Sequence, residues 1–293
     1  MLNILHAEWQ KMVGNRWTIG LLLWVFPVGA LAFVAGMSLM ALLSPTARDN
    51  LYIIPWTEAF LVPWRFVNNP FGLMFLLGFT AVTFAGEYQW GTWKNIVTRQ
   101  QRTLLIMAKF TNLGALILIA FILTSLIFGG GFGIFSLIAD VPYEPAATGE
   151  IVQEFLRDYA LETALAFISI IITAVYAALA AIVMQSILGG TLVGIGFSLI
   201  DPLIFGMIWW WANLFNTVSV LHLGRISLFY NIENIKSWIR DDQAVATLES
   251  AFQTFNKAAP IDSIGFSMLA LAVWLLGGVG LVLYLFQRQD ITT

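Results

Sequence analysis

The sequence predicts an all-α membrane protein that crosses the bilayer six times. Of its 293 residues, 59% are apolar and 11% are charged, whereas about 25% of residues are charged in a soluble domain. The apolar residues gather in six segments, and a membrane-spanning helix needs about 20 such residues. We expect these segments at residues 17–43, 71–85, 104–139, 161–184, 187–211 and 264–286. No low-complexity linker separates them, so we treat residues 1–293 as one membrane domain.

Residues 1–16 are too polar to span a membrane, but their apolar residues recur at spacings of three and four. These residues are Leu2, Leu5, Trp9, Met12 and Val13. Polar residues such as Glu8 and Lys11 fill the other side, which is typical of an amphipathic helix at the membrane surface. The alternative is a frayed apolar tail. The segment that follows is far longer than the core of a signal peptide, so we expect it to stay attached.

The segments between the spans differ in composition from one side of the membrane to the other. Residues 44–70 contain four prolines and predict an irregular loop, and residues 140–160 predict an acidic loop. Residues 214–263 form the longest connection, and the part from 230 to 257 shows helical spacing of its apolar residues. We therefore expect external helices before the last span. Trp209, Trp210 and Trp211 indicate an aromatic belt at the outer boundary.

The loop after the second segment sets the predicted orientation. Between residues 86 and 110 it carries Lys94, Arg99, Arg102 and Lys109 against Glu87. Short loops rich in Lys and Arg stay in the cytoplasm. We therefore predict a multi-pass protein of the plasma membrane with both termini in the cytoplasm.

Composition also excludes several classes of function. The chain has no cysteine, two histidines and a net charge of −3. These values argue against disulfides, a histidine-rich metal site and a nucleic-acid partner. The sequence lacks a G-x-x-x-x-G-K-[ST] phosphate loop and a convergent set of catalytic groups. We therefore predict that the chain is not an enzyme and binds no cofactor of its own.

Asp201 is the one acidic residue in the middle of an apolar segment. A charge in lipid costs about 2.5–3.5 kcal/mol on the mildest scale, so such residues are often functional. Asp201 therefore predicts a position on a substrate path. The alternative is structural, because Pro202 can end a helix and Asp201 would then cap a second, short one.

Two groups of glycines predict close contacts between helices. Gly129, Gly130, Gly131 and Gly133 lie in the third segment, and Gly189, Gly190, Gly194 and Gly196 in the fifth. Both groups include the G-x-x-x-G spacing that lets membrane helices approach each other. Packing within the chain or across a dimer is the interpretation we favour.

The basic loop resembles the signature of the type-2 ABC exporter permeases. Their pattern E-x-x-x-G-T-x-K is matched by Glu87, Gly91, Thr92 and Lys94, followed by Arg102 and then Lys109. Arg99 stands where the family usually has proline. The order of a surface helix, six spans and external helices before the last span is also similar to that family.

This resemblance implies that residues 87–103 bind a cytoplasmic ABC ATPase subunit, which would carry ATP and Mg²⁺. Trp90 and Trp93 would be buried anchors, and Lys94, Arg99 and Arg102 would pair with acids of the ATPase. Glu87 would cap the following turn or pair with a base further along the helix. The competing interpretation is that the basic residues set the topology and contact lipid headgroups.

The predicted function is therefore the permease subunit of an ATP-driven exporter for a hydrophobic or amphiphilic substrate. The chain would work as a homodimer or with a similar permease chain, in contact with membrane lipid. Two alternatives remain at this point. One is a membrane scaffold that transmits ATPase motion to a partner without moving a substrate. The other is an ion-coupled transporter that uses Asp201.

Overall fold

The regular structure of the chain is helical. The computed structural model describes residues 2–66, 70–93 and 101–289, and over these ranges it contains α-helices and short 3-10 helices without a β-strand. In the part described, four helices are long and apolar enough to cross a membrane: α3 (Val25–Leu43), α9 (Arg102–Ala139), α10 (Gly149–Met184) and α14 (Ile264–Arg288). Their length and composition indicate an all-α, membrane-embedded protein, as predicted.

The two other predicted spans are helical but do not belong to these four. They correspond to α7 (Pro70–Gln89) and α11 (Ile187–Leu214). The first predicted span, 17–43, is divided into α2 (Arg16–Leu22) and α3, because the chain turns at Leu23 and Trp24. By these criteria the described residues support four spans, whereas the sequence predicted six.

The connections contain more helix than the sequence predicted. The predicted irregular loop at 44–70 holds three short helices, α4 (Pro45–Asp49), α5 (Trp56–Ala59) and α6 (Val62–Phe66). Residues 149–160 were predicted as an acidic loop but form the first three turns of α10. The Thr148 hydroxyl accepts a hydrogen bond from the Ile151 N–H at 3.4 Å, and such a cap favours a helix start. Glu150 in the first turn adds a favourable dipole interaction.

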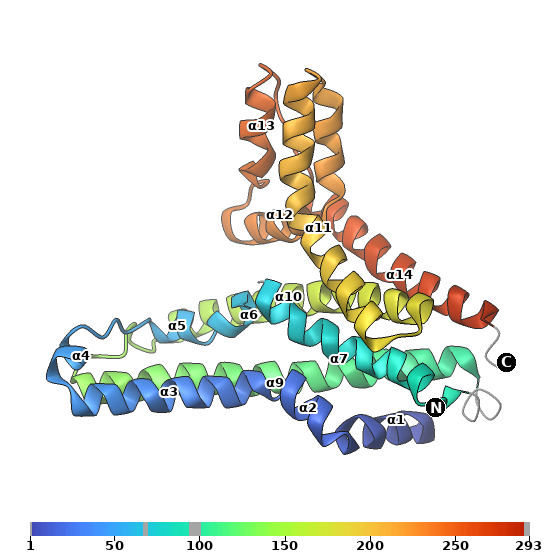
Figure 1. The fold of residues 1–293 in the computed structure, drawn as a ribbon. Coiled ribbons are helices and arrows are strands. Elements are labelled where there is room, and N and C mark those ends of the chain that lie inside the picture. The colour runs from blue at the N-terminus through green and yellow to red at the C-terminus, as the bar shows by residue number, and fades with distance from the viewer. Residues whose placement is uncertain (1, 67–69, 94–100, 290–293) are drawn as a thin grey trace.

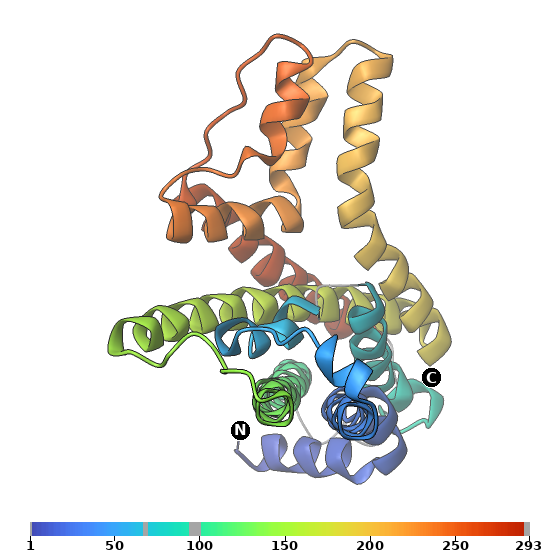
Figure 2. The ribbon, with the colours of Figure 1, turned by 90° about the vertical axis from the view of Figure 1, so that its left-hand side faces the viewer.

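A separate helical unit precedes the last span. It consists of η1 (Val218–Ile226), α12 (Leu228–Asp241), η2 (Ala246–Leu248) and α13 (Glu249–Gln253). We call these elements the 218–253 lobe. With the end of α11 it stands to one side of the long helices (Figures 1 and 2). The predicted amphipathic helix between residues 230 and 257 is confirmed as α12.

The long helices pack in two groups, with α3 against α9 and with α7, α11 and α14 against α10. Helices α3 and α9 run side by side (Figure 1), with the rings of Phe33 and Phe128 stacked at 5.6 Å. A Cβ atom on Gly131 of α9 would lie 2.3 Å from Val34 of α3, and one on Gly190 of α11 would lie 3.0 Å from the Ala181 Cα of α10. The predicted glycine contacts between helices are confirmed at these positions.

Both ends of the chain meet the start of α9. The N-terminal helix α1 (Leu2–Gly14), predicted as residues 1–16, receives a hydrogen bond of 2.8 Å from Asn112 Nδ2 to the Leu5 carbonyl. At the other end, Arg102 donates to the carbonyls of Phe286 and Gln289 at 3.0 and 2.7 Å. Helix α1 and the C-terminal end of α14 therefore lie at the same end of the molecule (Figure 1).

Candidate functional site

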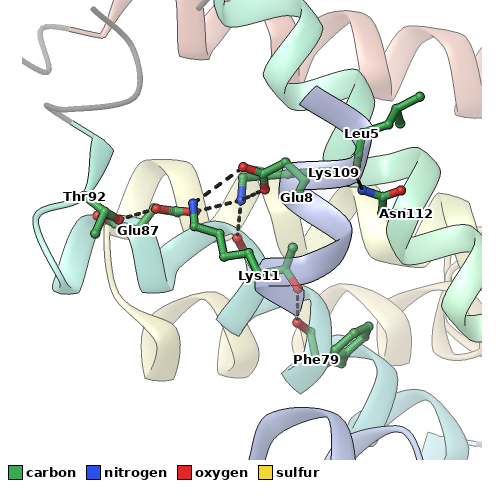
Figure 3. Close-up of polar contacts among 9 residues, drawn as sticks. Leu5, Glu8, Lys11, Phe79, Glu87, Thr92, Lys109 and Asn112 are labelled. Carbon is green, nitrogen blue, oxygen red and sulfur yellow. Dashed lines mark hydrogen bonds and ion pairs between the residues drawn. The ribbon is translucent and has the colours of Figure 1, made fainter. Parts of the chain in front are cut away.

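Four charged side chains meet where α1, α7 and α9 come together. Glu8 and Lys11 come from α1, Glu87 from the last turn of α7, and Lys109 from the second turn of α9 (Figure 3). Lys109 Nζ lies 2.8 Å from Glu8 Oε2 and 3.0 Å from Glu87 Oε1. Lys11 Nζ also pairs with Glu87 and lies 3.5 Å from Glu8. We call these four residues the Lys109 cluster.

The Lys109 cluster is balanced in charge and largely shielded from solvent. The side chain of Lys109 is 2% exposed, and those of Glu8 and Glu87 are 5% and 4% exposed. Lys109 has three N–H donors and uses the third on the Thr83 carbonyl at 3.1 Å. Every donor of the buried ammonium therefore has an acceptor. Removing one partner of such a pair typically costs about 3–5 kcal/mol, because a buried charge is left uncompensated.

Glu87 is held in its charged form. Burial raises the pKa of its carboxyl. The Lys109 charge and the hydrogen bonds from Lys11 and Thr92 lower this pKa by more than burial raises it, so it falls from 4.5 to about 2. The Thr92 hydroxyl reaches the carboxylate because Gly91 adopts a positive φ of 65°, which turns the chain back toward α7. The predicted pairing with a base further along the same helix is not found, because both bases that pair with Glu87 lie on other helices, Lys11 on α1 and Lys109 on α9.

The two tryptophans of the loop have opposite environments. Trp93 is 1% exposed and packs within the chain, with its ring 4.5 Å from Phe286 and 5.3 Å from Lys109 Nζ. The prediction that Trp93 anchors a partner protein is therefore wrong for this conformation. Trp90 is 60% exposed. Its ring lies against Gly86, where a Cβ atom would come within 2.9 Å of it. Trp90 remains available as an anchor.

Arg102 has a different role from the predicted one. Its guanidinium donates to the carbonyls of Phe286, Gln287 and Gln289, at 3.0, 2.9 and 2.7 Å. These carbonyls lie at the C-terminal end of α14, where helix carbonyls lack partners and a cation is favoured. Arg102 therefore holds the end of α14 to the start of α9, and its pairing with acids of a partner is not supported.

Three other predicted site residues are described in part or not at all. Lys94 and Arg99 lie outside the described residues, so their role stays a prediction. Asp201 lies within α11, which continues through Pro202 to Leu214. No helix begins at Asp201, so the capping interpretation is wrong, and a position on a substrate path stays a prediction.

Glu8 and Lys11 were missed as site residues, because the helical pattern placed both on a polar, surface-facing side of α1. The sequence did hold one signal. Lys109 stands within the apolar run LLIMAKF, and a cation there needs a nearby acid. With the predicted spans and cytoplasmic termini, the acidic residues on the same side as the basic loop are Glu8, Glu87 and Asp290, so Glu8 was one of three candidates.

A second buried carboxylate, that of Glu162, lies where α10, α12 and α6 meet. Glu162 of α10 is 2% exposed and lies 2.9 Å from Arg240 and 3.1 Å from Lys236, both of α12. Arg65 of α6 lies 3.6 Å away. We call these four residues the Glu162 cluster. It attaches the 218–253 lobe to the long helix α10 and to α6.

Comparison with known proteins adds no assignment. No family of known proteins matches the chain, and no curated protein matches it. The argument for a function therefore rests on the chemistry of these clusters and on the signature of the loop.

Proposed function

We propose that the chain is the permease subunit of an ATP-driven exporter of the type-2 ABC class. A separate cytoplasmic ATPase, which would hold ATP and Mg²⁺, binds the loop between α7 and α9. The permease itself hydrolyses no ATP and carries no cofactor. It moves a hydrophobic or amphiphilic substrate across the plasma membrane, as a homodimer or with a similar chain.

The observation that supports this proposal best is the Lys109 cluster, because it joins the loop to two helices. Glu87 lies in the last turn of α7, just before the chain leaves this helix toward α9. It is paired with Lys11 of α1 and Lys109 of α9. The contacts of Trp93 and Arg102 with the end of α14 add a third helix. A force applied to the loop by a partner would therefore reach α1, α9 and α14 together.

The loop also offers a surface for the partner. Trp90 exposes most of its side chain beside the Lys109 cluster, and large aromatic residues are common anchors of protein interfaces. Lys94 and Arg99 follow in the sequence, and we propose that they pair with acids of the ATPase. The segment 87–103 thus carries the basic residues of the signature and is attached to other helices at both ends, through Glu87 and Arg102.

We propose six spans and a cytoplasmic position for both termini. Helix α7 has 20 residues. Its apolar residues 71–85 cross the bilayer as a short span, which local thinning of the bilayer accommodates, and its last turn with Glu87 lies at the cytoplasmic surface. Helix α11 has 28 residues. Because α1 and the end of α14 meet the start of α9, the number of crossings is even, and α3, α7, α9, α10, α11 and α14 supply six. The first, second and fifth of these line the substrate path between two permease chains.

A scaffold without transport is the second candidate. The attachment of the 218–253 lobe to α10 and α6 through Glu162 favours it, because movement of the membrane helices would also reach this lobe and a partner bound there. Reconstitution of the purified complex in vesicles separates the two candidates. Loss of a labelled amphiphile from one leaflet on addition of ATP supports the exporter.

The proposal is tested by isolating the tagged chain from its native membrane and assaying ATP hydrolysis in the eluate. We expect an ATPase to accompany the wild type and to be lost with Lys94→Glu and Arg99→Glu together. The matched control is Arg157→Glu with Lys257→Glu, which makes the same change in charge on the proposed outer side and should retain the ATPase. Absence of an ATPase from the wild type, or its retention by the loop variant, contradicts the proposal.

A further inference from the structure

A cavity lies in the 218–253 lobe, outside the long helices. It has a volume of about 690 Å³ and lies between the end of α12, α13 and the segment that returns to α14. Pockets for small molecules usually measure about 300–1,000 Å³ and combine apolar walls with a few polar groups. The volume of this cavity is therefore in the range of a small-molecule site.

The walls of this cavity are fixed by hydrogen bonds to α12. Asn234 is fully buried and accepts from the Val245 N–H at 3.0 Å on one wall. Its amide nitrogen donates to the Asp262 carbonyl at 3.1 Å, just beyond the other wall. The Trp238 indole N–H donates to the same carbonyl at 2.8 Å, which fixes its ring at the cavity. These hydrogen bonds within the chain fix the walls of the cavity.

The lining of the cavity favours an apolar organic cation. Much of the wall is small and apolar, including Ala244, Ala258 and Pro260. Trp238 also lines it, and the face of an indole attracts cations. The charged residues at the cavity are Asp242, Glu249 and Lys257, which together carry one net negative charge.

We propose that the 218–253 lobe binds a small apolar organic cation between α12, α13 and residues 257–261. The ligand places its apolar body against the alanines and Trp238 and its charge near Asp242 and Glu249. Asp262 follows the cavity wall directly, and Asn234, which holds this wall, also donates to Ser267 in the first turn of α14 at 2.9 Å. The site therefore lies next to the start of the last span. This binding does not depend on the proposed exporter function.

The test uses two ions of the same shape and opposite charge. The probe is tetraphenylphosphonium, and tetraphenylborate is its anionic counterpart. Because the chain has no cysteine, Ala246→Cys allows one trifluoromethyl label in the cavity wall. Fluorine NMR of the full chain in phosphatidylcholine nanodiscs then reports occupancy of the cavity rather than partition into lipid.

We expect tetraphenylphosphonium to shift the fluorine signal saturably and tetraphenylborate to bind at least tenfold more weakly. Asp242→Asn with Glu249→Gln should weaken binding of the cation about tenfold. Both residues are exposed, and asparagine tolerates the positive φ of 53° at position 242. Narrowing the cavity with Ala258→Trp should weaken the saturable shift.

The matched control for Asp242→Asn alone is Asp241→Asn, which removes one negative charge from the end of α12 outside the cavity lining; Asp242→Asn should weaken binding, whereas Asp241→Asn should leave the affinity unchanged. The proposal is overturned if tetraphenylphosphonium gives no saturable shift or if tetraphenylborate binds equally well. An equal loss of affinity with Asp241→Asn would also overturn it, because a general surface charge would then explain the binding.

Discussion

The Lys109 cluster and the Glu162 cluster each bury carboxylates where three helices meet, but they differ in where the positive charge lies. In the Lys109 cluster one ammonium is 2% exposed and depends on two buried acids. In the Glu162 cluster the cations Arg65, Lys236 and Arg240 are 40%, 13% and 31% exposed around one buried acid. Thus a buried cation connects the helices in the Lys109 cluster, whereas partly exposed cations connect them in the Glu162 cluster.

This difference determines how far each cluster can tolerate a change. Lys236 and Arg65 also pair with Glu233 and Glu58, so the cations around Glu162 have other partners. Among the ion pairs of the described residues, Lys109 has no acidic partner outside its own cluster. Its three N–H donors are all used inside the protein. We therefore expect the Lys109 cluster to respond strongly to single substitutions and the Glu162 cluster weakly.

The largest effect is expected for Lys109→Met. The change leaves the buried acids Glu8 and Glu87 with Lys11 alone and should lower the free energy of unfolding by about 3–5 kcal/mol. Arg240→Met is the matched control in the Glu162 cluster and should cost about 1 kcal/mol or less. Denaturant unfolding of both variants in the same detergent measures the difference. Equal losses would remove the distinction between the two clusters.

The next effect is expected for removal of a carboxylate charge. Glu87→Gln keeps the shape of the side chain but weakens its charged hydrogen bonds to Lys11 and Lys109, at about 1.5–3 kcal/mol for such a bond. Glu162→Gln should cost less, because the surrounding cations reach water or other acids. Thermal unfolding of the two variants ranks them. A larger loss with Glu162→Gln would contradict the comparison.

Acid should act on the Lys109 cluster through Glu87. Its pKa is about 2 in the folded chain against 4.5 for the free carboxyl. The stabilisation is therefore complete above about pH 4.5 and is lost as the pH falls toward 2. The unfolding free energy measured between pH 6 and 2.5 should decline less steeply in Glu87→Gln than in the wild type. Identical slopes would show that Glu87 is not held ionised.

The smallest effect is expected for Lys11→Gln, which tests whether burial or membership of the cluster decides the loss of unfolding free energy. Lys11 belongs to the Lys109 cluster, but its side chain is 42% exposed. If exposure decides the cost, Lys11→Gln should resemble Arg240→Gln, with losses of about 1 kcal/mol or less. A loss with Lys11→Gln as large as that with Lys109→Met would show that the number of charges matters more than burial. Parallel denaturant unfolding of the three variants decides between these results.

The sequence predicted the helices well where an apolar or amphipathic period was present, as in α1, α9, α12 and α14. It failed where a cap determined the structure. Thr148 starts α10 within a stretch whose acidic composition resembles a loop, and the turn at Leu23 and Trp24 has no proline or glycine to mark it. The sequence predicted six spans, but α7 and α11 are not among the four that length and composition support in the described residues. The apolar part of α7 is short, and α11 contains Asp201.

The candidate site was predicted in part. Glu87 and Lys109 were identified through the loop signature, and their contact spans 22 residues of sequence. Their partner Glu8 is 101 residues from Lys109, so local pattern could not reveal the pair. Trp93 and Arg102 resemble residues for an external partner, but their surroundings come from the far end of the chain, at Phe286 to Gln289. Tertiary packing determined their roles.

Hydrogen exchange of α1 tests the central claim most directly, namely that the Lys109 cluster holds α1 to α7 and α9. Peptides covering Leu2–Gly14 should be protected in the wild type in nanodiscs, and Lys109→Met should accelerate their exchange by about 100-fold, as expected for a local loss near 3 kcal/mol. Peptides from α12 should be unchanged. Unaltered exchange of α1 in Lys109→Met would contradict the claim, because α1 would then be held by other contacts.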